Sequence, residues 1–172
     1  MTLQETLDFY NIDKIWHFTD ISNVPSILEH GLLSLKIIEK LDISVSCFGA
    51  DKLSHDLDRY YGLDKYIHLS FIKEHPMCYK KKLHGDIPNP IWLAIDVSVL
   101  FDTGVYFATD VANKTGVSCH DIKKLEQKAD IEVLWGKTDW SDSKIKKRRL
   151  SAKRGEIMIP NKIKLENILE VA

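Results

Sequence analysis

The sequence predicts an α+β fold. Runs rich in β-branched, aromatic and aliphatic residues occur at 14–19, 66–72, 89–100, 131–136 and 155–160, and each is typical of a β-strand. The segments between them carry helix and loop signals. No internal repeat is visible, and no Gly/Ser-rich or Pro-rich linker divides the 172 residues. We therefore expect residues 1–172 to form a single domain.

The first predicted unit is a strand followed by a helix. Residues 14–19, KIWHFT, alternate apolar and polar side chains, as a half-buried strand does. In 20–33, Asp20 or Ser22 is a candidate N-cap, Pro25 stands in the first turn and Gly31 ends the helix. Strand side chains repeat every two residues, so the residues at 17 and 19 share one face. Two further helices are expected, over the first dozen residues and over 120–129.

The composition excludes several classes of protein. The chain has 24 Lys and Arg against 25 Asp and Glu, for a formal charge of −1, so any nucleic-acid site must be a local patch. Its three cysteines are far apart and form no C-x-x-C pair, which favours reduced thiols over a disulfide framework or a cysteine-rich zinc site. No basic leader with an apolar run and no stretch of about 20 apolar residues occurs. We expect a cytoplasmic protein.

Sequence motifs narrow the chemistry further. The chain contains no Walker A loop, no G-x-G-x-x-G, no H-E-x-x-H and no G-x-S-x-G, so nucleotide hydrolysis, Rossmann-type binding, zincin proteolysis and serine-hydrolase chemistry lack support. The seven histidines show no metal-ligand spacing. We expect no metal site.

A basic segment is the one strong shift in composition. Residues 144–154, KIKKRRLSAKR, hold seven positive charges in eleven positions. One interpretation is a solvated, mobile loop. The other is a phosphate-binding strip beside Glu156, which follows two residues later.

Scattered polar residues on the predicted strands are the remaining candidates for chemistry. They are His17 and Thr19 on the first strand, Ser70 on the second, Glu156 on the last, and Arg59 before the second. Taken singly, each has an ordinary structural explanation. His17 alone fits a satisfied core histidine, and Glu156 fits the polar end of an apolar strand.

Taken together, three segments resemble the DarT-type ADP-ribosyltransferases, toxins of bacterial toxin–antitoxin systems that modify nucleic-acid bases with NAD. WHFTDISNVPSILEHGLLS resembles the family's opening His-x-Thr strand and helix; YIHLSFIKEHPMCY resembles its strand and Pro-Met turn; SAKRGEIMIPNKI resembles its catalytic strand. The resemblance runs from about Ile15 to Val171. It implies a split half-barrel of β-strands with flanking helices, and NAD as co-substrate without a metal.

The resemblance also implies roles for individual residues. Where many family members carry an aromatic pair, this chain has Leu69-Ser70, so stacking on nicotinamide falls to Phe71 or Tyr66. Lys52 is a possible substitute for the family's functional arginine. The implied residues are Glu156 and Arg59 for catalysis; His17, Phe18, Thr19, Asn23, Gly31, Ser70 and Phe71 for NAD; and Lys146, Lys147, Arg148, Arg149 and Arg154 for nucleic acid.

These residue types suit the reaction. Breaking the bond between nicotinamide and ribose develops positive charge on the sugar, which a carboxylate stabilises while it takes a proton from the nucleophile. The acceptor base must leave its stack, which favours single-stranded DNA or RNA as partner. An antitoxin that removes ADP-ribose or binds the enzyme directly is a further expected partner. Transfer to protein, plain NAD hydrolysis and a non-catalytic nucleic-acid-binding module are the alternatives.

Overall fold

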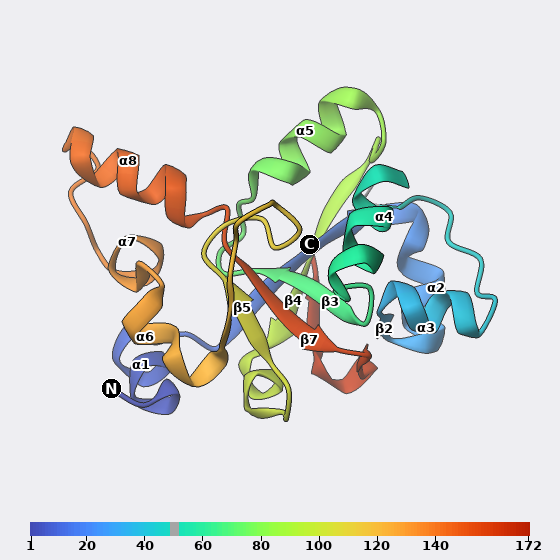
Figure 1. The fold of residues 1–172 in the computed structure, drawn as a ribbon, viewed down its shortest axis with the longest axis horizontal. Helices are drawn as coiled ribbons and strands as arrows, with labels where there is room; N and C mark the ends of the chain where they lie inside the picture. Colours follow the sequence, from blue (N-terminus) through green and yellow to red (C-terminus); the bar gives the residue numbers. More distant parts are fainter. Residues whose placement is uncertain (49–51) are drawn as a thin grey trace.

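The structure, a computed structural model, describes residues 1–48 and 52–172 and confirms the α+β class (Figure 1). In this part of the chain, seven strands form one sheet in the order β6-β5-β7-β3-β1-β4-β9, and every neighbouring pair is antiparallel. β2 and β8 form a separate antiparallel pair. The strands are β1 (Lys14–Asp20), β2 (Leu32–Leu33), β3 (Tyr66–Ser70), β4 (Pro90–Asp96), β5 (Tyr106–Ala108), β6 (Cys119–Asp121), β7 (Glu156–Pro160), β8 (Lys162–Ile163) and β9 (Ile168–Val171).

The sheet is split between β1 and β3. These strands pair in register only at Trp16 and Ser70, whereas β1 and β4 pair all along their length. Beyond that pair, the Nδ1 atom of His17 lies 2.9 Å from the carbonyl oxygen of His68. The His17 side chain thus takes the place of a backbone hydrogen bond between β1 and β3. The two strands diverge from this point and leave room between them.

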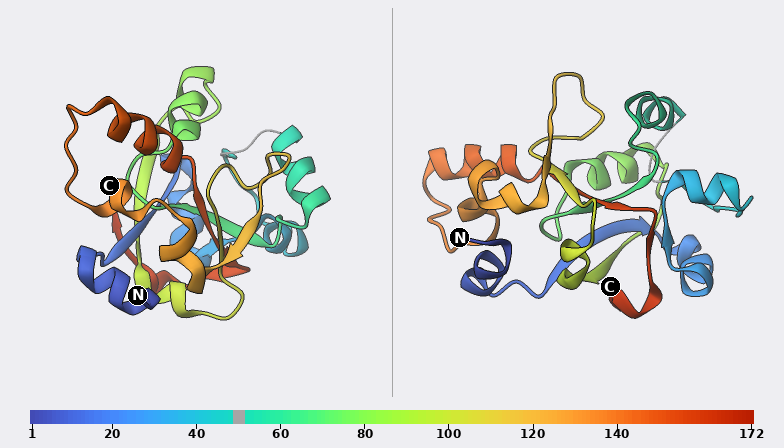
Figure 2. Two further views of the ribbon diagram at one scale, coloured as in Figure 1. Left: turned by 60° about the vertical axis from the view of Figure 1, so that its left-hand side comes forward. Right: turned by 60° about the horizontal axis from the view of Figure 1, so that its bottom comes forward.

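Helices lie at both ends of the sheet (Figures 1 and 2). α1, α6, α7 and α8 cluster near the N-terminus, and α2, α3 and α4 lie at the opposite end. None of the helices in 1–48 and 52–172 combines the length and apolarity that a membrane crossing requires. The helices are α1 (Leu3–Tyr10), α2 (Val24–His30), α3 (Leu35–Lys40), α4 (Lys52–Tyr61), α5 (Pro76–His84), α6 (Leu125–Lys128), α7 (Ile131–Trp135) and α8 (Ser143–Ala152).

Alternate side chains of β7 point to opposite faces of the sheet and join two different hydrophobic clusters. Ile157 and Ile159 of β7 belong to the main cluster, together with Leu69 of β3, while Met158 faces a smaller cluster with Ala108 on the other side. All of these side chains are almost completely buried. Because β7 is covered on both faces, its first residue, Glu156, stands at the edge of a well-packed element.

Most predicted elements are confirmed. The strands at 14–19, 66–72 and 155–160 appear as β1, β3 and β7, and the N-terminal helix as α1. The strand expected at 89–100 ends at Asp96. The Asp96 carboxylate accepts a hydrogen bond from the backbone N–H of Ser98 and so caps a 3₁₀ turn over Val97–Phe101.

Three segments differ from the prediction. The helix expected over 20–33 is a 3₁₀ turn at Ile21–Asn23 followed by α2, and β2 follows Gly31. In 120–129, the chain passes from β6 through a 3₁₀ turn to α6. The strand expected at 131–136 is wrong: this segment forms α7, in which Ile131 and Leu134, three residues apart, lie on one side of the helix and both join the main core.

Candidate active site

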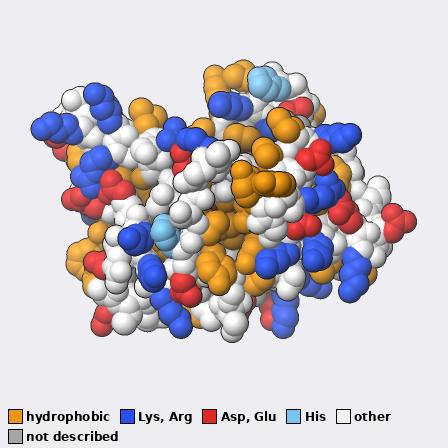
Figure 3. All heavy atoms as spheres, viewed as in Figure 1, with side chains coloured by type: hydrophobic (Ala, Val, Ile, Leu, Met, Phe, Trp, Pro, Cys, Tyr) orange, Lys and Arg blue, Asp and Glu red, His pale blue; other side chains and the backbone are white. Residues whose placement is uncertain are grey.

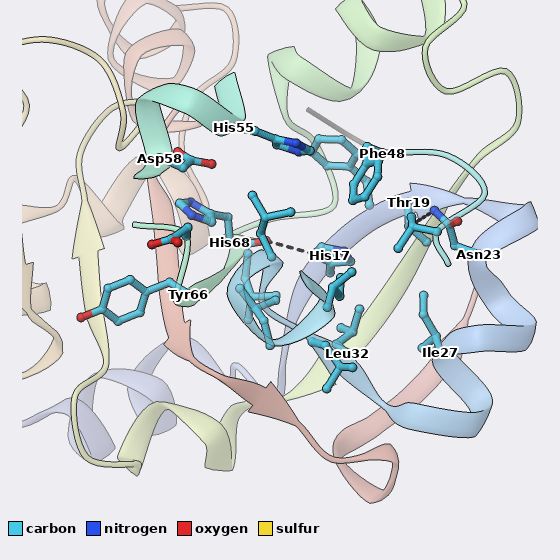
Figure 4. A pocket seen from close by; sticks show the side chains of 18 of the residues that line it. His17, Thr19, Asn23, Ile27, Leu32, Phe48, His55, Asp58, Tyr66 and His68 are labelled. Atoms are coloured by element: carbon cyan, nitrogen blue, oxygen red, sulfur yellow. Dashed lines mark hydrogen bonds between the residues drawn. The ribbon is translucent and has the colours of Figure 1, made fainter. Parts of the chain in front are cut away.

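An open cavity of about 260 Å³ lies where β1 and β3 diverge. Its walls come from β1, α2, the β2 segment, α4, β3 and the first residue of β7. Figure 4 shows His17 and Thr19 on one side and His55 and Asp58 of α4 on the other, with His68 between them. The polar residues among its lining are His17, Thr19, Asn23, Ser26, His30, Ser54, His55, Asp58, Asp64, Tyr66, His68, Ser70, His75, Asn113 and Glu156.

Glu156 begins β7 at the centre of the sheet. It lies directly opposite Ser70 of β3 and Ala108 of β5. The residue before it must be glycine, because a Cβ at Gly155 would stand 2.9 Å from the carbonyl oxygen of Ala108 and 3.0 Å from the ring of Phe71. The backbone therefore enters β7 pressed against its neighbours, and the Glu156 side chain projects toward the cavity.

The two carboxylate oxygens of Glu156 have different surroundings. Oε2 accepts the backbone N–H of Ala112 at 2.9 Å and lies 3.2 Å from Nδ1 of His68. Among residues 1–48 and 52–172, no hydrogen bond reaches Oε1, whose nearest basic neighbour is Nε2 of His75 at 4.0 Å. The side chain is 14% exposed. One oxygen is therefore held by the protein, and the other is left to act on a ligand.

His68 and Glu156 favour each other's charged forms. Burial opposes the charge on the ring, but the hydrogen bond and negative charge of Glu156, with a smaller effect of Asp58, raise the pKa of His68 to about 9. Burial likewise opposes the carboxylate, but the hydrogen bond and charge of His68 outweigh it and lower the pKa of Glu156. At neutral pH the pair is an imidazolium and a carboxylate.

His75 is the neutral neighbour of this pair. Its Nδ1 accepts the backbone N–H of Met77 at 3.2 Å, which caps α5, so the proton resides on Nε2. Nε2 then donates to the carbonyl oxygen of Arg154 at 3.4 Å. Burial lowers the pKa of His75. The ring therefore faces Glu156 without a charge of its own.

His17 and Thr19 present polar atoms to the cavity. Nδ1 of His17 donates to the His68 carbonyl oxygen, which leaves Nε2 as the free acceptor. Burial lowers the pKa of His17, so the ring stays neutral. Thr19 Oγ1 accepts from the side-chain amide of Asn23 at 3.1 Å, and its hydroxyl proton is left to donate elsewhere.

Asn23 also holds the next loop in place. Its Oδ1 accepts the backbone N–H of Cys47 at 3.1 Å, and its amide donates to the carbonyl oxygen of the same residue. The side chain is buried. Asn23 thus fixes both Thr19 and the segment that carries Phe48 at the cavity.

Most of the residues expected to bind NAD meet at this cavity, and Phe71 does not. Phe71 is 2% exposed and packs against Phe107 and Trp135 in the main core. The alternation of β3 gives the reason: 66, 68 and 70 share the cavity face, and odd-numbered residues face the core. Tyr66 does line the cavity, together with His17, Phe18, Thr19, Asn23, Gly31 and Ser70.

Gly31 has a clear structural requirement. It ends α2 with φ of 77°, and a Cβ there would stand 2.5 Å from the carbonyl oxygen of Ile163 in β8. The glycine therefore allows the end of α2 to lie against β8.

Arg59 lies outside the cavity lining. Its guanidinium pairs with Glu39 and with Asp56, at 3.0 Å for the latter, on the outer side of α4. The preceding residue, Asp58, and His55 one turn earlier line the cavity instead. Successive helix residues are about 100° apart around the axis, and here that rotation turns Arg59 away from the side of α4 on which His55 and Asp58 line the cavity. Lys52, at the start of α4, is exposed.

Most of the basic segment 144–154 lies in the helix α8, so the interpretation of this segment as a loop is wrong. Only its last two residues, Lys153 and Arg154, form a turn. Figure 3 shows its positive side chains interspersed with acidic ones. Arg148 pairs with Asp130 and Glu132 at 2.7 and 2.6 Å. Arg149 donates to the carbonyl oxygen of Val133 at the end of α7.

The other residues predicted to bind nucleic acid are one arginine that forms an ion pair and two exposed lysines. Arg154 pairs with Asp110 at 3.3 Å. Lys146 and Lys147 are exposed, and no ion pair of theirs occurs in the described chain. The arginines are therefore engaged in the fold, whereas the two lysines point to solvent.

The site residues that sequence reasoning missed are His68, His75 and Asp58. The parity of β3 is a signal for His68, which stands two residues before Ser70. No local pattern identifies the other two, because their positions depend on how α4 and the turn before α5 fold over the sheet. Among the residues that the structure describes, no group of His, Cys, Asp and Glu is arranged to hold a metal ion.

Comparison with known proteins places the chain in a family. A family profile described as "ssDNA thymidine ADP-ribosyltransferase, DarT" matches residues 16–172. No curated protein sequence matches.

Three solved structures share the fold. Thermus sp. 2.9 DarT in complex with ADP-ribosylated ssDNA has a TM-score of 0.70 at 16% identity, over 94% of this chain and 81% of that one. The same protein in complex with NAD+ has a TM-score of 0.60 at 17% identity, over 92% and 80%. Thermosipho africanus DarTG in complex with ADP-ribose has a TM-score of 0.69 at 19% identity, over 93% of this chain and 43% of that one. The present chain thus spans less than half of the Thermosipho chain but most of the Thermus one. With the profile covering nearly all of its length, the chain belongs to the DarT family of ssDNA thymidine ADP-ribosyltransferases.

Proposed function

We propose that this protein transfers ADP-ribose from NAD to the thymidine base in single-stranded DNA. The observation that carries the proposal is Glu156, a nearly buried carboxylate that is held through Oε2 and presents Oε1 toward a cavity. The family profile and the fold shared with DarT structures bound to NAD+ and to ADP-ribosylated ssDNA support it.

The donor and acceptor atoms at the cavity suit a dinucleotide. The neutral His17 offers Nε2 as an acceptor for a hydroxyl or amide, and Thr19 offers a hydroxyl proton. They stand two residues apart on a strand whose other side is anchored to β4, which favours a fixed orientation of the ligand. Ser70 and Tyr66 line the same cavity from β3.

In the reaction, the bond between nicotinamide and C1′ of ribose breaks and a bond from the base nitrogen to C1′ forms. The base loses one proton. Glu156 suits both demands of this step, because its negative charge stabilises positive charge on the sugar and its free Oε1 is available to accept the proton. The released products are nicotinamide and a proton, and the DNA retains the ADP-ribose.

The acceptor base must stand outside a stack to reach the cavity, which favours single-stranded DNA. Phe48 lines the cavity and is 41% exposed, so its ring offers a surface on which a base can stack. Lys146 and Lys147 are, with Lys144, the exposed lysines of the basic helix α8 that remain open to phosphate groups. RNA is the competing acceptor.

We further propose a toxin role. Modified bases in a DNA template obstruct copying, so such an enzyme needs a partner that removes ADP-ribose or blocks the site directly. The sequence segments that resemble the DarT-type toxins support this role in toxin–antitoxin or phage-defence systems. NAD and single-stranded DNA occur together in the cytoplasm, which is where we place the activity.

The test is to incubate the protein with NAD and single-stranded oligonucleotides that differ only in one thymidine, and to measure the added mass. We expect ADP-ribose on the thymidine oligonucleotide alone, and none with Glu156→Gln. Glu166→Gln, an exposed carboxylate in the 3₁₀ turn before β9, is the matched control and stays active. Modification of an RNA oligonucleotide instead, release of nicotinamide without DNA labelling, or an active Glu156→Gln variant overturns the proposal.

A further inference from the structure

We propose that His68 is the positioning residue of the active site, holding the Glu156 carboxylate as an anion with Oε1 turned to the cavity. This inference rests on the proposed function and adds a residue that touches Glu156 rather than the substrate. It starts from the contacts of Oε2, which lies between Nδ1 of His68 and the backbone N–H of Ala112.

The pleat of the sheet dictates this contact. β3 and β7 place Ser70 opposite Glu156 and His68 opposite Met158. His68 and Glu156 are therefore diagonal neighbours on one face, a spacing that long side chains can span. A histidine two residues before Ser70 reaches Glu156 without any distortion of either strand.

The two contacts on Oε2 define an orientation that neither provides alone. The Ala112 amide is fixed by the backbone after β5, at 2.9 Å, and the imidazole approaches from β3, at 3.2 Å. With Oε2 held from two elements, rotation of the carboxylate is restricted and Oε1 stays on the cavity side. Two donors on one oxygen also compensate the burial of the charge.

Other ionisable groups surround the pair but do not replace His68. His75 faces Oε1 at 4.0 Å and is neutral because its Nδ1 accepts the Met77 amide. Asp58, from α4, adds negative charge beside His68 and is influenced in turn by His55.

The remaining neighbours lie on other elements. His17 of β1 is influenced by His68, Cys119 of β6 is influenced by Glu156, and Lys153 influences His75. Arg154 is occupied by Asp110. Of these groups, His68 is the one whose side chain makes a hydrogen bond to Glu156 in the described chain.

The experiment compares His68→Gln and His68→Phe with the wild-type protein. Glutamine keeps a neutral donor, and phenylalanine keeps the ring shape without a donor. His84→Gln, an exposed histidine at the end of α5, is the control. Transfer to a thymidine oligonucleotide is measured from pH 5 to 10, with kcat separated from the KM for NAD, and folding is checked by thermal unfolding.

For the wild-type protein, we expect activity to be lost on the acid side only at low pH. On the alkaline side, activity should fall above about pH 9, where His68 loses its proton. In His68→Gln, the midpoint of the acid limb of the activity profile moves up by about 1–3 pH units, because the positive charge beside Glu156 is gone. The loss of activity at alkaline pH disappears in this variant. His68→Phe lowers kcat by ~10²-fold, the lower end of what a positioned base contributes, while KM for NAD changes less than threefold.

A second measurement does not need turnover. In a ¹³C NMR titration, the His68 ring of the wild-type protein should titrate near pH 9, and in Glu156→Gln it should titrate well below that. If the wild type transfers no ADP-ribose but shows this titration, the proposed function fails and the ion pair stands. If the wild type is active while His68→Gln keeps its pH profile, or if the ring titrates at its ordinary value, the inference about His68 is overturned.

Discussion

The ion pair between His68 and Glu156 makes a quantitative prediction about stability. The pKa of His68 rises from its ordinary 6.5 to about 9 in the folded protein. At 1.36 kcal/mol for each pKa unit, this rise corresponds to about 3 kcal/mol of folding free energy. Because 26% of the side chain is exposed, solvent screens the partner charge and about 3 kcal/mol is an upper bound.

The sign of the effect follows from proton binding. Below pH 6.5 the ring is protonated in both the folded and the unfolded chain, so the stabilisation is fully present. Between pH 6.5 and about 9 the folded protein binds more protons than the unfolded one, so stability falls as the pH rises, with a slope approaching 1.4 kcal/mol per pH unit. Above about 9 the contribution is lost.

Glu156→Gln removes the cause of the raised pKa. Urea unfolding of the wild type and the variant, at half-unit steps from pH 6 to 9.5, should show the wild type more stable at pH 6 and the two curves converging near pH 9. His84→Gln should follow the wild type throughout. Parallel curves for the wild type and Glu156→Gln over this range would refute the reasoning, since the ring would then titrate alike with and without its partner.

Three further predictions concern ligands and packing. His17→Ala and Thr19→Ala should each weaken NAD binding, measured by calorimetry, by about 1 kcal/mol for each lost hydrogen bond; unchanged affinity of the folded protein would assign both residues to packing alone. Replacing Lys146 and Lys147 by Gln should reduce the slope of log affinity against log salt by ~0.7 for each lost phosphate contact, and an unchanged slope would move the DNA path away from α8. Gly31→Ala should lower the unfolding free energy by more than 1 kcal/mol, because it combines a strained φ of 77° with a 2.5 Å clash, and a thermal melt within one degree of the wild type would contradict this.

Local periodicity predicts the part of the site that lies on strands. The two-residue repeat of a strand puts His17 and Thr19 on one face, and both line the cavity. The same rule, applied to the strand at 66–72, separates Ser70 from Phe71. Phe71 was predicted at the site because a family resemblance calls for an aromatic ring there, but parity turns it into the core. The repeat also brings His68 onto the cavity face.

The helical part of the site could not be predicted in this way. Which side of α4 faces the sheet depends on where the helix begins and how it packs, and neither follows from its sequence alone. The outcome is a shift by one residue: Asp58 faces the cavity and Arg59 faces Glu39 and Asp56. An error of one position in a helix rotates a side chain by about 100°, enough to exchange a site residue for a surface ion pair.

The helix at 131–136 and the ion pairs of the basic segment are two further differences from the sequence prediction, and the second depends on the first. As a central strand, 131–136 would have its carbonyl groups paired with the neighbouring strands. As the helix α7, the same segment ends with unpaired carbonyl groups at Val133 and Leu134, and Arg149 donates to both. Arg148 pairs with Asp130 and Glu132 at the start of that helix. Some of the positive charges that were interpreted as a phosphate-binding strip thus join α8 to α7. This use of the arginines can be predicted only once 131–136 is known to be a helix.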